Sequence, residues 1–569
     1  MSTAASITIP ETLRLLDGRF AAFAQGVTED RYALWLGSAI SFDRLPGLKQ
    51  IIEKVLEHLR SHINPLDADC KYKSALENAL TVASITAVER TRCDFGTSFS
   101  TWPDADALLS RLVNQYSRLL QIEVAGEEDD YLLWEAVNVV AVFADPTKQP
   151  DAEHLCVALL VLEGVFSEIA SANWDGLIEK AVQEVADNHT TLAVFVRPQD
   201  FQQLHGKANL YKFHGCAVKA KSNEALYRPY FTASQAQING WAQKNAAMAD
   251  RLQQMIVSRP TLMIGLSAQD PNIQNIFSKA EASVHWPWPG DRPSYVFSTS
   301  DLGVDQKSLL QIVYRESMTA LNRPDIAGSA AFPAYAKPLL LGLTLYVLAA
   351  KLKMLIELAH LPPTFSAADK ILLWEGINTC RDQIAEGIGA DKFSFLKSFI
   401  TLSGKAISMF HSGQVPGLPS LYLPLTSSAP QHFQGDATLL SSGLTEAAIA
   451  VGVIGLLVQD GKLEIQKSDP GIFGSGAVCF KSTVGSAKVF FAANSNVALR
   501  LEANGLVTSS SDTIVIHSFE IVSPSPRSPK AGFGRTGYGA RREASISTLI
   551  SQSKSVSELV QLFRMEVGI

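Results

Sequence analysis

Apolar runs that stop at small or polar residues recur through the first half of the chain. Runs with the length of a buried strand begin at Ala33, Thr191, Asn209, Thr261 and Tyr295. The segments between them place apolar residues at three- and four-residue steps, which is typical of helices. Strands that alternate with helices predict a doubly wound parallel sheet in an α/β fold. Any ligand is then expected at the carboxyl ends of the strands.

Helical and β patterns divide the remainder of the chain. Residues from about 50 to 170 predict a helical insertion after the first strand, and residues 331–412 predict a helical segment. From about residue 453 the pattern favours β-structure. We expect strands at Leu456–Val458, Leu463–Ile465, Lys488–Phe491 and Val497–Leu501, with turns at Asp460-Gly461 and Asn504-Gly505.

These patterns give the predicted domain organisation. It consists of an α/β unit over 1–330, the helical segment 331–412, a small β-rich C-terminal domain over 413–522, and a basic linker with a last helix over 523–569. The β-rich domain carries no visible catalytic constellation. We therefore assign it to assembly or partner binding.

Composition narrows the class of protein. The chain has 569 residues, too many for one core, and its net charge of −7 gives no global reason to expect nucleic-acid binding. The six cysteines lie far apart without metal-ligand spacing, so we expect reduced, mostly buried thiols and no zinc. No signal peptide is visible, and the apolar stretches 338–350 and 447–458 are shorter than the ~20 residues of a membrane span. We therefore expect a cytoplasmic protein without a membrane partner.

Polar residues at the strand ends are the candidate chemistry. Gly37 and Ser38 follow the first strand and allow a tight turn that a phosphate could approach, although such turns are more often structural. Asn173 and Asp175 lie in a loop between packed elements, where they point at a ligand or cap a helix. His214 ends a predicted strand beside a glycine, where it acts as a base or is a satisfied structural residue.

Taken together, these motifs resemble the sirtuin-like domains, and most of all the bacterial defence branch of that family. The resemblance covers about residues 20–310. The motifs that carry it, in order, are Gly37-Ser38-Ala39-Ile40-Ser41, Asn173-Trp174-Asp175-Gly176-Leu177-Ile178-Glu179, Lys212-Phe213-His214-Gly215, Ile264-Gly265-Leu266-Ser267 and Asp270-Pro271-Asn272-Ile273. The resemblance implies a Rossmann-like sheet that binds NAD as a substrate.

The resemblance also implies roles for particular residues. His214 would be the base near the nicotinamide ribose, and Asn173 and Asp175 would hold that ribose and position water. The remaining residues would line the NAD pocket: Gly37, Ser38, Ala39 and Ser41 at the phosphates and ribose, and Gly265 and Ser267 at the adenosine side. The implied chemistry is cleavage of the nicotinamide–ribose bond through an oxocarbenium-like state, in which positioning and electrostatic support matter most.

The sequence departs from the family pattern at two places. Ser38 and Ala39 stand where the family usually has alanine and glycine, which crowds the phosphate loop. Ala172 stands where deacylating sirtuins carry glutamine, and a four-cysteine zinc module is absent from the sequence. These departures favour an NAD hydrolase over a deacylase. A catalytically silent scaffold that binds NAD or ADP-ribose is the third hypothesis, against which His214 and Asn173 argue.

Partners are expected from the resemblance and from the C-terminal third. Relatives of this kind work beside a HerA-type ATPase, which we favour, or a short Argonaute, and a closed homo-oligomer fits the HerA ring. The linker interleaves basic and aromatic residues, which fits a nucleic-acid backbone or a flexible segment that orders on a protein. A capping-box pattern at Ser555 opens a last amphipathic helix that we interpret as a docking device. We expect nucleic acid to be reached through the partner.

Overall fold

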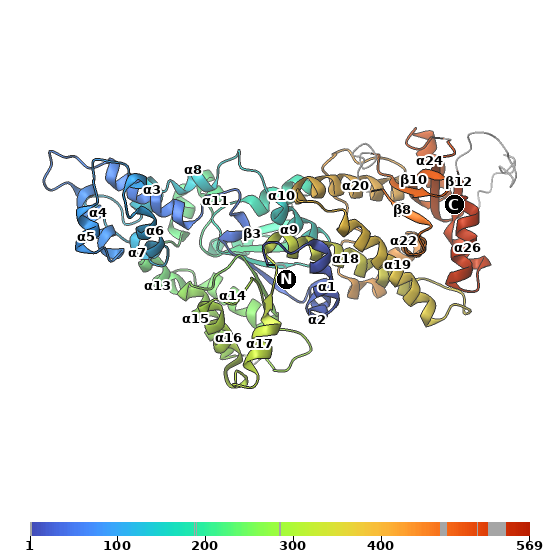
Figure 1. The fold of residues 1–569 in the computed structure, drawn as a ribbon, viewed down its shortest axis with the longest axis horizontal. Coiled ribbons are helices and arrows are strands. Elements are labelled where there is room, and N and C mark those ends of the chain that lie inside the picture. The colour runs from blue at the N-terminus through green and yellow to red at the C-terminus, as the bar shows by residue number, and fades with distance from the viewer. Residues whose placement is uncertain are drawn as a thin grey trace.

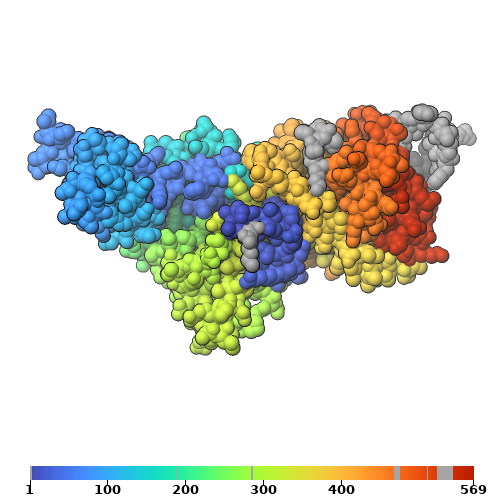
Figure 2. Space-filling view, viewed as in Figure 1, coloured from blue at the N-terminus to red at the C-terminus, as the bar shows by residue number. Residues whose placement is uncertain are grey.

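The computed structural model describes residues 3–186, 188, 190–283, 286–466, 475–508, 510–521 and 542–569. The described chain is elongated (Figure 1). The blue helical insertion lies at one end, a central sheet follows, and the orange and red C-terminal unit lies at the other end. In the space-filling view, the yellow-green part of the chain protrudes at the lower edge of the molecule (Figure 2).

A seven-stranded parallel sheet organises the N-terminal half, which confirms the predicted doubly wound α/β fold, although two of its strands, β2 and β7, are not among the five runs that the sequence predicts. The strands are β1 (Ala33–Leu36), β2 (Glu168–Ser171), β3 (Leu192–Phe195), β4 (Ala208–Lys212), β5 (Thr261–Ile264), β6 (Tyr295–Ser298) and β7 (Ala331–Phe332). Their order is β3-β4-β2-β1-β5-β6-β7. Strand β1 pairs with β2 on one side and β5 on the other, so the chain changes direction across the sheet at β1. Ligands of such sheets bind at this switch point.

Helices cover both faces of this sheet because both faces of its strands are apolar. In β1, Leu34 and Leu36 pack into one core, and Ala33 and Trp35 pack into the core on the opposite face. The first core takes residues from α1 (Ile9–Asp17), α2 (Ala21–Thr28), α9 (Ala152–Leu162), α10 (Leu177–Val185) and α18 (Ala336–Leu358). The second takes residues from α13 (Gln235–Lys244), α14 (Ala246–Ser258), α15 (Pro271–Glu281), α16 (Val304–Tyr314) and α17 (Arg323–Ala330).

The insertion between β1 and β2 is helical, with a hydrophobic core of its own. It comprises α3 (Leu48–Ser61), α4 (Lys71–Val82), α5 (Ala87–Thr91), α6 (Ala105–Val113), α7 (Tyr116–Leu119), α8 (Val139–Phe143) and then α9. Short helices α11 (Ala217–Ser222) and α12 (Glu224–Tyr227) follow β4 and pack against it.

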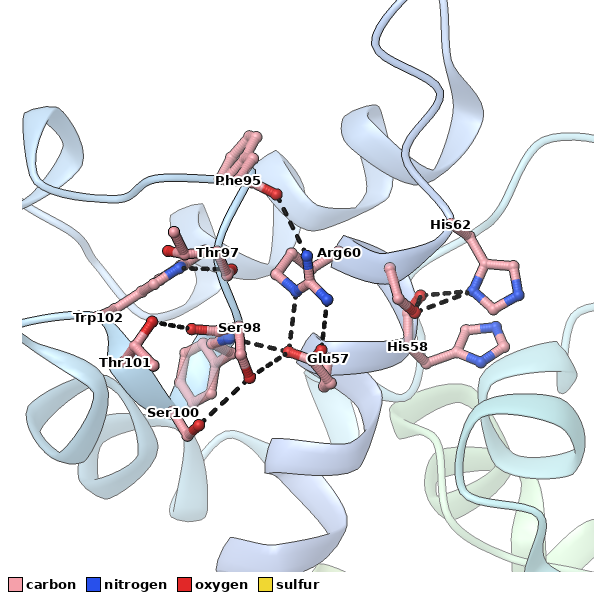
Figure 3. A network of polar contacts seen from close by, with 12 residues as sticks. Glu57, His58, Arg60, His62, Phe95, Thr97, Ser98, Ser100, Thr101 and Trp102 are labelled. Atoms are coloured by element: carbon pink, nitrogen blue, oxygen red, sulfur yellow. Dashed lines mark hydrogen bonds and ion pairs between the residues drawn. The ribbon is translucent and has the colours of Figure 1, made fainter.

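A polar network centred on Glu57 fixes one loop of the insertion (Figure 3). The Glu57 carboxylate accepts hydrogen bonds from Nε of Arg60 at 2.9 Å, from the backbone N–H of Phe99 at 2.8 Å and from Oγ of Ser98 at 3.3 Å. Hydrogen bonding to Arg60 is the main cause that lowers the pKa of Glu57. The charged carboxylate thereby ties α3 to the loop before α6.

The C-terminal unit contains a five-stranded mixed sheet and more helix than the sequence predicts. Its order is β12-β11-β10-β9-β8, with β10, β11 and β12 parallel and the pairs β8–β9 and β9–β10 antiparallel. Its elements are α19 (Ala367–Glu386), α20 (Lys392–Ser412), α21 (Ala437–Ser441), α22 (Leu444–Gln459), β8 (Leu463–Ile465), β9 (Val478–Ser482), β10 (Gly485–Asn494), α24 (Ser495–Ala503), β11 (Thr513–Phe519), β12 (Arg542–Ser545), α25 (Ile546–Gln552) and α26 (Val556–Val567).

Three predictions for this unit are wrong. The segment 456–458 ends the helix α22, and the segment 497–501 lies inside the helix α24, where strands are predicted. Asn504-Gly505 forms the turn after α24 rather than a hairpin, because β10 and β11 on either side are parallel. The strands at Leu463–Ile465 and within β10 are confirmed.

The last helix packs on its own chain. Side chains of α26, including Leu559 and Phe563, are buried in the core that α22 and the five-stranded sheet form. The predicted N-cap is confirmed, since Oγ of Ser555 accepts the backbone N–H of Glu558 at 3.3 Å. The interpretation of α26 as a free docking device is therefore wrong. Most of the basic linker, including Arg527, Lys530, Phe533, Arg535, Tyr538 and Arg541, lies outside the described residues.

Helix α18 joins the two halves of the molecule. It is longer than the apolar stretch identified in the sequence, and within the described residues it is the one helix long and apolar enough to cross a membrane. In the most apolar 18-residue stretch of this helix, 67% of the residues are buried inside the protein. It also carries Lys351, which is fully buried and donates to the Glu163 carboxylate at 2.5 Å. These contacts are those of a core helix.

Candidate functional site

A pocket of about 310 Å³ opens at the carboxyl ends of β1, β2, β4 and β5. Eight of the nine predicted site residues line it: Ser38, Ala39, Ser41, Asn173, Asp175, His214, Gly265 and Ser267. They come from four loops that are far apart in the sequence. The sheet brings them together at the switch point beside β1, as parallel strands do.

Gly37 has a packing role and does not line the pocket. A Cβ at this position would lie 2.3 Å from the carbonyl oxygen of Gly265, which is too close for any side chain. Gly265 has a φ of +68°, and a Cβ there would lie 2.9 Å from the amide nitrogen of Ile40. The loops after β1 and β5 thus touch backbone to backbone, because both positions are glycine. Ser38 and Ala39 directly follow this close backbone contact.

The N-terminal end of α3 borders the pocket. Gly47 and Leu48, at the start of this helix, are among the lining residues. The partial positive charge of a helix N-terminus favours anionic ligand groups. The strand, turn and helix predicted from the sequence are therefore present, with a short 3-10 turn over Ser38–Ser41 between them.

Asn173 presents an unpaired polar atom at the pocket. Its side chain is 7% exposed, and among the described residues its Oδ1 atom has no hydrogen-bond partner. Its backbone N–H donates to Oγ of Ser171 at 3.1 Å, which fixes the turn after β2. A buried carbonyl oxygen without a partner is costly unless a ligand or water pairs with it. Asn173 is therefore placed to bind a ligand.

Asp175 is engaged by the protein itself. One carboxylate oxygen accepts the backbone N–H of Leu177 at 3.0 Å, and the other accepts the hydroxyl of Ser41 at 3.1 Å. The first contact is the helix-capping alternative considered from the sequence. The second links the loops after β1 and β2. Both Ser41 and Asp175 line the pocket, but the Ser41 hydroxyl is already used.

His154 extends this link and was missed by sequence reasoning. It is fully buried on α9, its Nε2 lies 3.1 Å from Oγ of Ser41, and its Nδ1 accepts the backbone N–H of Asp151 at 3.1 Å. Because Nδ1 is an acceptor, Nε2 carries the proton and donates to Ser41. Burial lowers the pKa of His154 to about 4, so the ring is neutral at pH 7. The only sequence signal is a histidine three residues after a helix-capping aspartate.

Lys212 fixes the loop after β2 through a hydrogen bond to its backbone. It is 1% exposed, and its Nζ donates to the Glu179 carboxylate at 2.9 Å and to the backbone carbonyl of Asp175. Burial alone would lower the pKa of Lys212, but its interactions with Cys216, Glu179 and Asp175 outweigh burial and raise it. The lysine is therefore charged. Its contact with the carbonyl of Asp175 fixes the backbone between Asn173 and α10.

His214 follows β4 and turns into the pocket. Its carbonyl accepts the indole N–H of Trp174 at 2.9 Å and the backbone N–H of Thr232 at 3.2 Å. The next residue, Gly215, has a φ of +101°, a conformation that favours glycine. The imidazole Nε2 lies 3.1 Å from the carboxylate of Asp270. His214 is thus held by its backbone, and its ring faces a buried acid.

The helical insertion supplies an apolar wall. Phe42, Leu45, Leu48, Ile51, Tyr116 and Phe143 are the apolar and aromatic residues that the insertion adds to the lining of the pocket. Of these, Tyr116 comes from α7, and burial is the main cause that raises its pKa. A pocket with one apolar and one polar wall suits a ligand that has both aromatic and hydroxyl groups.

The described residues contain no group of three or more His, Cys, Asp or Glu side chains arranged to hold a metal ion. Five of the six cysteines are buried. Burial raises the pKa of Cys380 to about 12, which is typical of an inert structural thiol.

The fold and the pocket define a doubly wound α/β protein with a ligand site at the switch point of its sheet. The sequence model of the SIR2-like domain matches residues 167–311, which supports a sirtuin-like family for this chain. SIR2-like domains bind NAD. The match runs from the start of β2 into α16, so it contains Asn173, Asp175 and His214. No curated protein sequence matches the chain.

Proposed function

We propose that the chain is an NAD glycohydrolase, which cleaves the nicotinamide–ribose bond of NAD with water. The observation that carries the proposal is the unpaired Oδ1 of Asn173, buried in the same pocket as His214 within a SIR2-like domain. Sirtuin-like enzymes use NAD as a substrate. An orphaned amide oxygen beside a histidine suits a ribose, whose hydroxyls donate hydrogen bonds.

The chemistry needs little acid assistance. The bond between C1′ of the ribose and the nicotinamide nitrogen breaks, and its electron pair leaves with the nicotinamide, which becomes neutral. Water adds to C1′ and gives up a proton, so the products are ADP-ribose, nicotinamide and H⁺. Asn173 orients the ribose, Asp175 supplies negative charge near the cationic sugar, and His214 accepts a proton from a ribose hydroxyl or from the water.

The pocket favours water over an acyl-lysine as the acceptor. Ala172, at the position where deacylating sirtuins have glutamine, lines the pocket. A short apolar side chain leaves space for water beside Asn173 and removes a group that deacylases use. NAD hydrolysis is therefore the reaction we favour, and protein deacylation is the alternative.

The biological role that we propose is depletion of cellular NAD in anti-phage defence, by abortive infection in the cytoplasm. We propose a HerA-type ATPase as the partner and a homo-oligomer as the working form, with nucleic acid reached through the partner. A short Argonaute is the alternative partner. The resemblance to the defence branch supports this role, as does the large C-terminal unit beyond the matched domain.

The first experiment measures NAD loss and nicotinamide release by the purified chain, alone and with its genomic neighbour and DNA. His214→Ala and Asn173→Ala should each lower the rate at least a hundredfold, because one removes the base and the other the ribose contact. Matched controls are His360→Ala and Asn114→Ala, at exposed positions outside the pocket.

The outcomes separate the three hypotheses. Nicotinamide release that both pocket variants abolish and both controls retain supports the hydrolase. Nicotinamide release that requires an acylated peptide would establish the deacylase instead. NAD that binds but stays intact in every mixture would leave a nucleotide-binding scaffold.

A further inference from the structure

Asp270 occupies a special place at the end of β5. It is the N-cap of α15, where one of its carboxylate oxygens, Oδ1, accepts the backbone N–H of Asn272 at 2.8 Å. The carboxylate lines the pocket, and its side chain is 8% exposed. Helix capping uses only one of the two carboxylate oxygens. The other oxygen, Oδ2, is left for a second contact.

That second contact is His214. Oδ2 of Asp270 and Nε2 of His214 are 3.1 Å apart, which is the distance of an ion pair, but the ring is not aligned for a hydrogen bond, and among the described residues neither atom has a hydrogen-bond partner. Burial acts to raise the pKa of Asp270, but His214 and the N–H of Asn272 together hold that pKa below its ordinary value. The carboxylate is therefore charged at neutral pH. A buried carboxylate in this place favours a proton on the nitrogen that faces it.

We propose that Asp270 is the positioning residue of His214: it accepts the Nε2 proton, fixes the ring and leaves the lone pair of Nδ1 to act as the base. This inference rests on the proposed function and adds a residue to it. A histidine whose second nitrogen is bound to a carboxylate keeps one tautomer and one orientation. The cap on Asn272 in turn fixes the carboxylate, so α15 positions the base through two contacts.

A capping role alone would explain Asp270 without any function, and one substitution separates the two. Asp270→Asn keeps an oxygen for the N–H of Asn272, since asparagine caps helices as well as aspartate does. It replaces the charged acceptor at His214 with an amide that can donate. We expect the melting temperature to stay within about 2 °C, the KM for NAD to change less than threefold, and kcat to fall at least tenfold.

The matched control is Asp391→Asn, which changes the aspartate N-cap of α20, a residue that does not line the pocket. It should leave kcat and KM unchanged. In the His214→Ala background, Asp270→Asn should not lower the residual rate further, because Asp270 acts only through that ring. A normal kcat for Asp270→Asn, or an equal loss of rate in both backgrounds, would overturn the inference.

A spectroscopic measurement tests the same contact without turnover. In the ¹⁵N spectrum of ring-labelled histidine, assigned by comparison with His214→Ala, Nε2 of His214 should carry the proton in the wild-type chain. Asp270→Asn should move that proton to Nδ1, because the new amide donates to Nε2. An unchanged tautomer sinks the inference. An inactive wild-type chain that shows the tautomer change would sink only the hydrolase.

Discussion

At the scale of single residues, some polar groups of the pocket are free to bind a ligand, and others are bound to the protein itself. Asn173 keeps a free oxygen, whereas Asp175 and Ser41 use their side-chain oxygens on each other and on the backbone. Lys212 acts below them by holding the carbonyl of Asp175. The geometry of the loop after β2 therefore depends on the charged Lys212, which does not line the pocket.

Removing that charge should damage both folding and activity. Lys212→Met leaves the Glu179 carboxylate without its cation, and we expect the free energy of unfolding to fall by about 3–5 kcal/mol. Activity should fall further than the folded fraction, because the carbonyl of Asp175 loses its donor. Urea unfolding and nicotinamide release on the same samples check this. Lys307→Met, at an exposed position of α16, should change neither quantity.

Sequence reasoning found residues that carry a signal in their own neighbourhood and missed those that act across the fold. The small residues after β1 and the histidine after β4 follow apolar runs, so their places are readable. Asp270 stands in a motif that carries the family resemblance, and His154 follows a helix-capping aspartate, but the sequence does not show their pairing with His214 and Ser41, which are distant in sequence. Only the packing of α9 and α15 against the sheet brings these pairs together.

At the scale of elements, the alternation of strands and helices in the first half was predictable, whereas two apolar runs of the C-terminal unit that are predicted as strands form helices. The segment Val497–Leu501 alternates like a strand. The side chain of Asn494 accepts the N–H of Val497 at 3.0 Å, however, and the helix that it caps buries Val497, Ala498 and Leu501 on one face. A local cap thus overrides β-propensity.

The N-terminal end of α9 carries an acid that should make stability depend on pH. Burial raises the pKa of Glu153 to about 7, while the unfolded value is about 4.3. Between these values the folded chain keeps a proton that the unfolded chain has lost. The stability that this residue contributes is therefore full below about pH 4 and is lost as the pH rises to 7.

Glu153→Gln removes this dependence. We expect the variant to match the wild-type chain at pH 4 and to exceed its free energy of unfolding by about 3 kcal/mol at pH 8. Denaturant titrations at the two pH values measure it. Glu375→Gln, at an exposed position of α19, serves as the control, and an equal gain at both pH values would contradict the assignment.

At the scale of the whole molecule, α18 connects the pocket to the C-terminal sheet. Near its start, Lys337 lies 2.5 Å from the Asp43 carboxylate in the loop beside the pocket and 3.1 Å from Asp151. Farther along, Lys351 pairs with Glu163 and donates to the carbonyl of Thr426 at 2.7 Å. One helix therefore contacts the pocket loop, the sheet layer and the second unit.

The buried pair tests this connection. Lys351→Met leaves Glu163 charged in the interior, and we expect a loss of about 3–5 kcal/mol in the free energy of unfolding. Adding Glu163→Gln should restore part of that loss, because no charge is then left buried while the oxygen can still accept from Tyr422. Calorimetry of the single and double variants measures both. A double variant that is less stable than the single one would contradict this account.

The hydrophobic core around α9 determines where the chain can be cut into fragments that keep their cores. Leu339, Leu343 and Val347 of α18 belong to the same core cluster as Leu34 of β1, and Ile400 of α20 and Tyr422 join it from farther along the chain. The region that resembles the sirtuin-like family ends at about residue 310, before α18, α20 and Tyr422. A fragment that ended after β7 would expose the apolar face that α18 covers, and it would lose part of its hydrophobic core. The part of the chain that shares one hydrophobic core is therefore longer than the region that carries the sequence motifs.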